Sequence, residues 1–194
     1  MSVPRLVLAS TSTYRRELLA RLQLPFEVRA PAVDETALPG EAARDTAMRL
    51  AAAKARAVSA EFAQALVIGS DQVAALDGIS LGKPGNHSTA VVQLRAMRGK
   101  SVVFHTAVAL HNTGSGVLQL AEVPTVVCFR HYSDVEIEAY LAREKPYDCT
   151  GSAKIEGLGI VMLERVNSDD PSALIGLPLM RLSAMLRNEG IAVV

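Results

Sequence analysis

The chain has 194 residues, with 20 basic and 20 acidic side chains, so its formal net charge is zero. A general nucleic-acid-binding protein usually carries a basic excess, so the composition argues against a nucleic-acid polymer as partner. Hydrophobic residues make up 49% of the chain, which supports a full core, excludes a disordered protein and fits a single domain over residues 1–194.

Hydrophobic periodicity, turn residues and capping residues predict strands and helices in irregular alternation. The expected strands cover 6–9, 26–30, 65–76, 102–110, 117–129 and 160–166. The expected helices are 14–22, 41–62, 88–97 with Ser88 as cap, 133–143 with a capping box, and one that starts at Pro178 and ends before Gly190. Because strands and helices mix irregularly, we expect a mixed sheet flanked by helices, in an α/β or α+β fold.

Neither a membrane span nor a secretion signal is expected. The chain has no run of about 18 apolar residues, and residues 1–5 lack the apolar segment of a signal peptide. The two cysteines, Cys128 and Cys149, lack metal-binding spacing. We interpret them as buried thiols of a cytoplasmic protein with no membrane partner.

The most informative segment runs from Gly69-Ser70-Asp71 to Gly82-Lys83-Pro84. The polar triplet interrupts an apolar strand, and its glycine permits close approach of another group. A turn at Asp77-Gly78 then returns the lysine to the region of the aspartate. An acid that holds a metal or a water, beside a cation that stabilises developing charge, suits phosphate chemistry. A buried structural pair is the alternative.

A second candidate is the strand, turn and helix over residues 8–16. Hydroxyls at Ser10 and Ser12 precede a helix N-terminus, which offers free N–H groups and a partial positive charge. With Arg15 in the first turn, this segment could bind an anion. A serine cap followed by solvated arginines is the alternative. The chain contains no Walker A sequence.

Three further positions could belong to the same site. Glu35, which follows Asp34 in an expected loop, could bind Mg²⁺ or could simply keep the loop soluble. Lys54 lies among alanines on the apolar stripe of its helix, where it either reaches a phosphate or extends its ammonium to solvent. Glu156 lies in the glycine-rich segment 151–159, which is either backbone near a ligand or a plain turn.

Taken together, these segments resemble the Maf family of nucleoside triphosphate pyrophosphatases. The resembling segments, in the family's order, are Leu8–Leu19, Asp34-Glu35, Lys54-Ala55, Gly69–Asp71, Gly82–Pro84 and Gly176–Leu179. The match runs from about residue 6 to residue 190. Thr13 departs from a proline that is usual in the family.

The resemblance implies an α/β fold shared with inosine triphosphate pyrophosphatases, with two lobes around a cleft and commonly a homodimer. It implies an enzyme that uses Mg²⁺ or Mn²⁺ to cut a nucleoside triphosphate between the α and β phosphates, which releases pyrophosphate. The implied roles are proton acceptor for Asp71, assisted by Glu35, Lys54 and Lys83, with metal binding by Asp71 and Glu35. The implied phosphate ligands are Ser10, Ser12 and Arg15. A free aspartate has a pKa near ~3.9 and is therefore a weak base at neutral pH. Asp71 is thus more credible as the base for a metal-bound water, whose pKa is lowered, than for a free water.

Three positions distinguish two branches of the family. The branch that acts on dTTP and UTP usually has arginine, threonine and glutamine where this chain has Tyr14, Gln72 and Glu156. The combination found here resembles the branch that acts on 7-methyl-GTP. The methylated base is a cation, which a carboxylate favours and on which an aromatic ring stacks, at roughly 0.5–2 kcal/mol.

Other functions stay open from the sequence. A dTTP/UTP pyrophosphatase is the nearest alternative, and a non-catalytic, nucleotide-binding regulator of cell division is a second. A structural protein whose polar strand residues form buried pairs is a third. The joint presence of Asp71, Lys54 and Lys83 speaks against a pure binder, which has no need of the acid.

Overall fold

The computed structural model describes residues 5–194. Its strands are β1 (Arg5–Ala9), β2 (Glu27–Arg29), β3 (Ala65–Leu76), β4 (Ile79–Leu81), β5 (Ser101–Asn112), β6 (Leu118–Phe129) and β7 (Leu163–Ser168). Its helices are α1 (Thr13–Ala20), α2 (Ala43–Ser59), α3 (His87–Met97), α4 (Asp134–Glu144) and α5 (Leu179–Asn188). Short 3-10 turns are η1 (Thr150–Ser152), η2 (Leu158–Met162) and η3 (Ala173–Ile175).

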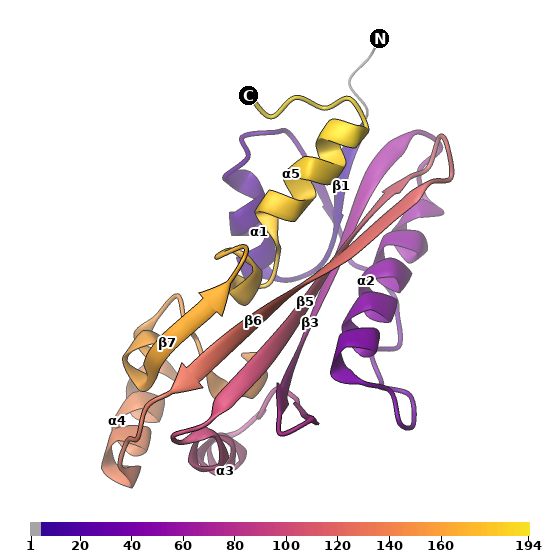
Figure 1. Ribbon diagram of the computed structural model, residues 1–194. Coiled ribbons are helices and arrows are strands. Elements are labelled where there is room, and N and C mark those ends of the chain that lie inside the picture. Colours follow the sequence, from indigo (N-terminus) through magenta and orange to yellow (C-terminus); the bar gives the residue numbers. More distant parts are fainter. Residues whose placement is uncertain (1–4) are drawn as a thin grey trace.

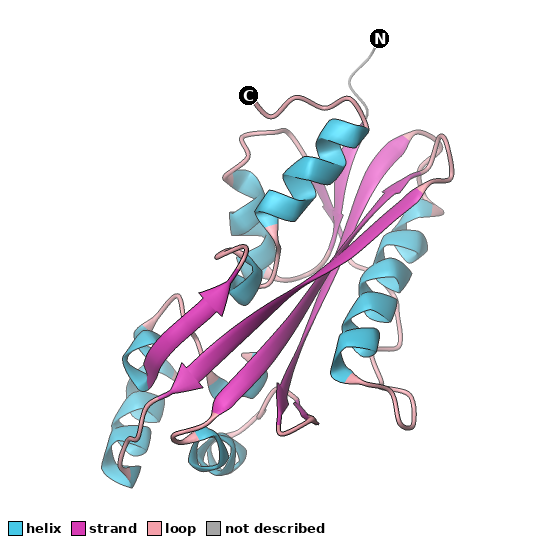
Figure 2. Ribbon diagram, viewed as in Figure 1, coloured by secondary structure: helices cyan, strands magenta, loops and turns pink. Residues whose placement is uncertain are grey.

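The strands form one mixed sheet, as the sequence predicts. Its order is β2-β1-β3-β5-β6-β7, and β4 pairs with β3 beyond the end of β1. The strands β2, β1 and β3 run parallel to one another, whereas the pairs β3–β5, β5–β6 and β6–β7 are antiparallel. Figure 1 shows the long strands β3, β5 and β6 crossing the molecule, with helices on both sides (Figures 1 and 2).

The two faces of the sheet bury different helices because strand side chains alternate. Leu66 and Ile68 of β3 pack with α1 and α5, whereas Val67 between them packs with the α2 side. Gly69 meets α2 so closely that an added β-carbon would lie 2.1 Å from the Ala51 carbonyl oxygen. The expected close approach at this glycine is therefore confirmed, and the neighbour is a helix.

The edge of β3 is open where the polar residues occur. Strand β1 pairs with β3 only as far as Gly69, and β4 pairs with it from Ala74 onward. Within residues 5–194, the stretch 70–73 therefore has no strand beside it on this edge. The carboxyl ends of parallel strands are the usual place for ligands in α/β sheets, so the strand lengths position the site.

The residues predicted to begin two of the helices are wrong. Asn86, not Ser88, caps α3, because its side chain accepts from the Thr89 N–H at 2.9 Å. Pro178 is the residue before α5, not its first residue, since its carbonyl accepts the helix's first bond, from the N–H of Leu182. The capping box that begins α4 is confirmed.

The strand expected over 160–166 is wrong at its start. Residues 158–162 form the turn η2, and β7 begins only at Leu163. The apolar residues Ile160 and Val161 that suggested a strand are exposed, Ile160 by 53%, so they do not enter the core. A short apolar run in the sequence is consistent with either a buried strand or an exposed turn, so it does not distinguish the two.

Neither cysteine is in a disulfide, and they differ in burial. Cys149 is buried as expected, and burial, reinforced by Asp148, raises the pKa of its thiol to about 12. The expected burial of Cys128 is wrong, because it is partly exposed on β6. Hydrogen bonds to Ser101 and Arg165 lower the pKa of Cys128.

None of the helices within residues 5–194 has the length and hydropathy that a membrane span requires. The signal-peptide interpretation rests on residues 1–5, of which residues 1–4 lie outside the described part of the chain.

Candidate active site

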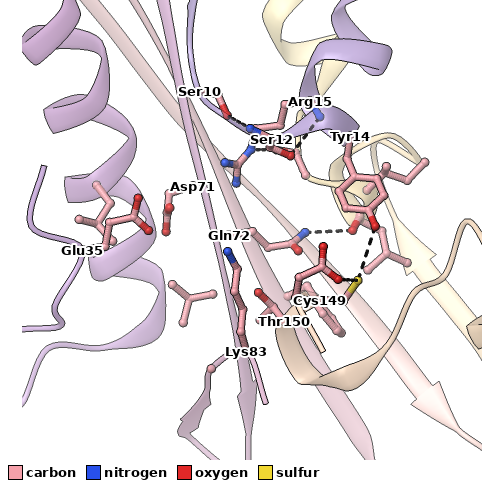
Figure 3. A pocket seen from close by; sticks show the side chains of 18 of the residues that line it. Ser10, Ser12, Tyr14, Arg15, Glu35, Asp71, Gln72, Lys83, Cys149 and Thr150 are labelled. Atoms are coloured by element: carbon pink, nitrogen blue, oxygen red, sulfur yellow. Dashed lines mark hydrogen bonds between the residues drawn. The ribbon is translucent and has the colours of Figure 1, made fainter. Parts of the chain in front are cut away.

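A pocket of about 740 Å³ opens at the exposed edge of β3 (Figure 3). This volume lies within the range of roughly 300–1,000 Å³ that is common for small-molecule sites. All ten residues proposed from the sequence line it: Ser10, Ser12, Tyr14, Arg15, Glu35, Lys54, Asp71, Gln72, Lys83 and Glu156. The structure therefore brings together six segments that are far apart in the sequence.

A lysine joins the two candidate acids. The Lys54 ammonium lies 2.7 Å from Oδ1 of Asp71 and 2.8 Å from Oε1 of Glu35. Lys54 is 3% exposed and Asp71 is 6% exposed, whereas Glu35 lies on the exposed loop before α2. The alternative in which Lys54 extends to bulk solvent is therefore wrong. Burial raises the pKa of Glu35, but the hydrogen bond and charge of Lys54 outweigh it and the net pKa is lowered.

Asp71 and Glu35 could bind a metal ion whose coordination is completed by a bound substrate. Within residues 5–194, no group of three or more His, Cys, Asp or Glu side chains is arranged to hold an ion. Mg²⁺, however, is commonly bound through one or two carboxylates together with substrate phosphates and water. Asp71 and Glu35, held on one ammonium, form a carboxylate pair of this kind.

The α1 end of the pocket carries donors for an anion. The Ser12 hydroxyl caps α1 by accepting from the Arg15 N–H at 3.4 Å, and the Ser10 hydroxyl accepts from the Ser12 N–H at 3.1 Å. Both hydroxyls keep a proton to donate. Burial lowers the pKa of Arg15, but an arginine stays charged in proteins. The expected strand, turn and helix thus reach the pocket.

Lys83 enters the pocket from the opposite side, on the loop between β4 and α3. Gln93 donates to the carbonyl of the preceding Gly82 at 3.0 Å, and the Gly151 N–H donates to the same oxygen at 3.3 Å. In Figure 3 the side chains of Arg15, Asp71 and Lys83 point into one shared space. The pocket therefore holds three cationic side chains, those of Arg15, Lys54 and Lys83, together with the buried acid.

The three positions expected from the sequence to select the base, Tyr14, Gln72 and Glu156, also line the pocket. The Tyr14 hydroxyl lies 3.9 Å from the Cys149 sulfur, and burial raises the pKa of this tyrosine. The amide nitrogen of Gln72 donates to Thr106 and to backbone carbonyls of η3, which leaves its oxygen for a ligand. Partial burial, with Glu144 and Asp148 nearby, raises the pKa of Glu156.

A family model described as Maf-like protein matches residues 5–189 of the chain. The chain belongs to the Maf-like protein family.

Its relatives in this family are similar over nearly their whole length. A protein of Thiobacillus denitrificans named 7-methyl-GTP pyrophosphatase is 60% identical, over 98% of this chain and 94% of its own. Proteins with the same name from Albidiferax ferrireducens and Cupriavidus metallidurans are 59% and 57% identical. Those two alignments cover 97% and 96% of this chain, and 95% and 94% of the relatives.

Two features of this Maf-like site could not be predicted from the sequence. Asp148 and Cys149 line the end that holds Tyr14, although their spacing matches no motif. The loop of Glu35 is tied down by Arg49, which pairs with Glu41 at 2.6 Å and donates to the Thr36 carbonyl at 3.1 Å. The Arg49 hydrogen bond lowers the pKa of Glu41 to about 2. A pair spaced by eight residues across a helix start has no sequence signature.

Proposed function

We propose that the chain hydrolyses 7-methyl-GTP between its α and β phosphates, giving 7-methyl-GMP and pyrophosphate. The observation that carries the proposal is the cluster of Asp71, Lys54 and Glu35 at the open edge of β3, inside a pocket of about 740 Å³. Relatives named 7-methyl-GTP pyrophosphatase, about 60% identical over almost the full chain, support the substrate.

The phosphates are proposed to lie between α1 and Lys83. The free N–H groups of α1 and the hydroxyls of Ser10 and Ser12 donate to phosphate oxygens. The guanidinium of Arg15 and the ammonium of Lys83 offset the negative charge, and an arginine can bind a phosphate through two parallel hydrogen bonds. The nucleotide then occupies a cleft, and the two-lobed arrangement and the homodimer that the family resemblance implies belong to the same proposal.

Asp71 is proposed to accept a proton from the attacking water. The water oxygen forms a bond to the α phosphorus in line with the bond that breaks, and pyrophosphate leaves with the electron pair. Arg15 and Lys83 stabilise the charge that develops on the leaving group. Lys54 holds the carboxylates of Asp71 and Glu35 toward each other. A divalent cation, Mg²⁺ or Mn²⁺, bound by Asp71 and Glu35 would add positive charge next to the phosphates.

The base is proposed to lie against Tyr14. The carboxylate of Glu156 can accept hydrogen bonds from N1–H and the 2-amino group, and it favours a base that carries a positive charge. The phenol ring can stack on the same cation. The oxygen of Gln72, whose nitrogen is held by η3, contributes a further fixed acceptor.

The test is pyrophosphate release from 7-methyl-GTP, GTP, UTP and dTTP, with and without Mg²⁺, by the wild type and by Glu156→Gln. The wild type is expected to prefer 7-methyl-GTP. GTP offers the same N1–H and 2-amino donors, so only the attraction between the carboxylate and the cationic base distinguishes the two substrates. Because that attraction contributes about 1–4 kcal/mol at contact distance, Glu156→Gln is expected to lower the preference over GTP by ~10- to 100-fold.

The matched control is Glu164→Gln, which removes an exposed carboxylate on β7 outside the pocket and is expected to leave the preference unchanged. A preference unaltered by Glu156→Gln would show that Glu156 does not recognise the base. Fast turnover of UTP and dTTP without turnover of 7-methyl-GTP would contradict the substrate, and no release from any triphosphate would favour a binding protein.

A further inference from the structure

A buried hydroxyl lies directly behind the pocket. Ser70, on β3 next to Asp71, is 0% exposed and is not among the residues that line the pocket. Its oxygen lies 2.8 Å from the Ala107 carbonyl of β5 and 2.9 Å from the Gly176 carbonyl. One hydroxyl proton is therefore shared between two carbonyls, in a three-centre bond. The side chain links the sheet to the segment that follows η3.

The Gly176 carbonyl has a second donor, and that donor is in the pocket. The Nε of Arg15 donates to the same oxygen at 2.8 Å. A carbonyl oxygen has two lone pairs, so it can accept from both side chains at once. Gly176 has a φ of 121°, a conformation that glycine adopts without strain.

The turn that carries this carbonyl is fixed to the sheet at other points too. Gln72 donates to the carbonyls of Ala173 and Leu174 at 3.1 and 3.0 Å, and the Thr106 hydroxyl donates to Ala173 at 2.9 Å. Ser70 and Gln72 are on the same face of β3, whereas Asp71 between them faces α2. The strand therefore holds the acid on one side and the turn on the other.

The hydrogen bond to the Gly176 carbonyl determines the orientation of the Arg15 guanidinium. Because its Nε is engaged by Gly176, the terminal nitrogens remain for a ligand, and in Figure 3 the guanidinium lies above Asp71 and Gln72. A guanidinium recognises phosphate through a planar pair of donors, so its orientation matters as much as its charge. Displacing a substrate-positioning group by about 1 Å can lower the rate ~100-fold.

We infer that Ser70 is a positioning residue for the reaction, which acts by fixing the Gly176 carbonyl and thereby orienting the guanidinium of Arg15 toward the substrate phosphates. The inference rests on the proposed function, because it takes Arg15 as a phosphate ligand. In Ser70→Ala the Gly176 carbonyl loses its hydroxyl donor, and the guanidinium loses a fixed partner although every residue that lines the pocket is retained.

The experiment compares Ser70→Ala with Ser59→Ala. Ser59 on α2 is 8% exposed, donates to the Ala55 carbonyl at 2.7 Å and lies outside the pocket lining. Both changes remove a buried hydroxyl that binds a carbonyl, so both are expected to lower Tm by about 2–4 °C. Only Ser70→Ala is expected to lower kcat/KM for 7-methyl-GTP, by ~10- to 100-fold.

A second readout is the affinity for inorganic pyrophosphate, measured by calorimetry. We expect Ser70→Ala to weaken it ~10-fold, whereas Ser59→Ala leaves it unchanged. In an Arg15→Ala background, Ser70→Ala is expected to change neither kcat/KM nor pyrophosphate affinity further, because the effects of residues in one hydrogen-bond network are not additive.

The outcomes separate this inference from the proposed function. If Arg15→Ala leaves turnover and pyrophosphate affinity unchanged, the phosphate role of Arg15 fails. If Arg15→Ala lowers both but Ser70→Ala behaves like Ser59→Ala, or has the same effect in both backgrounds, the positioning role fails. Should Ser70→Ala not fold, Ser70→Cys replaces it, since a thiol is a weak donor. Wild-type kinetics of Ser70→Cys would overturn the inference, and reduced kcat/KM with weakened pyrophosphate binding would support it.

Discussion

Replacing Asp71 by asparagine is expected to lower the rate of pyrophosphate release at least ~100-fold, the effect that is typical of losing a general base. The amide keeps the shape of the side chain, but it neither accepts the proton of water nor carries the charge. The fold is expected to persist, because Lys54 still has Glu35 as a partner at 2.8 Å. The measurement is kcat for 7-methyl-GTP at saturating substrate, together with Tm.

The control for this prediction is Asp169→Asn, an exposed aspartate outside the pocket, for which we expect wild-type kcat. A kcat of Asp71→Asn within a few-fold of the wild type would remove Asp71 from the chemistry. A large drop in Tm would instead assign Asp71 a structural role. The measured kcat would then have to be corrected for the fraction of the variant that is folded.

Replacing Lys54 by methionine is expected to affect both stability and turnover. Asp71 is 6% exposed, and Lys54 is its partner at 2.7 Å. Removing one member of a buried ion pair typically costs about 3–5 kcal/mol, because the remaining charge has no compensation. For a chain of this size, each kcal/mol lowers Tm by about 2–4 °C. Methionine keeps an unbranched apolar stem within the alanine-rich surface of α2, so packing is largely preserved.

The double variant Lys54→Met/Asp71→Asn separates the two effects. Replacing the stranded carboxylate by a neutral amide is expected to restore most of the lost Tm without restoring turnover. A Lys54→Met variant as stable as the wild type would mean that the ammonium does not compensate Asp71. Recovery of turnover in the double variant would contradict the catalytic role of the pair.

Local patterns were sufficient to predict much of the site. The apolar run 65–68 predicts a buried strand, and the polar residues that interrupt it occur where β1 stops pairing. The alanine stripe of α2 leaves open whether Lys54 reaches into a site or extends to solvent, and the structure decides this, because its ammonium is buried on Asp71 and Glu35. The sequence alone could place each of these residues on an element. Only the family resemblance predicted that these residues meet in one pocket. In the structure they do line one pocket.

The rest depends on contacts between distant segments, which leave no periodic signal. The carbonyl that Ser70 and Arg15 share belongs to Gly176, separated from them by 106 and 161 positions. The start of α5 is similar, since Asp170 accepts from the Met180 N–H at 2.7 Å across the turn η3. Tertiary packing determines which backbone carbonyl or distant side chain binds at a helix start. A proline or a serine near that start in the sequence therefore predicts the cap less reliably.

If water attacks the α phosphorus of 7-methyl-GTP in this pocket, hydrolysis in water labelled with oxygen-18 labels only the nucleotide product. Mass spectrometry of both products is expected to find 7-methyl-GMP that carries one labelled oxygen and pyrophosphate that carries none. Label in the pyrophosphate, or formation of 7-methyl-GDP and inorganic phosphate, would contradict attack at the α phosphorus.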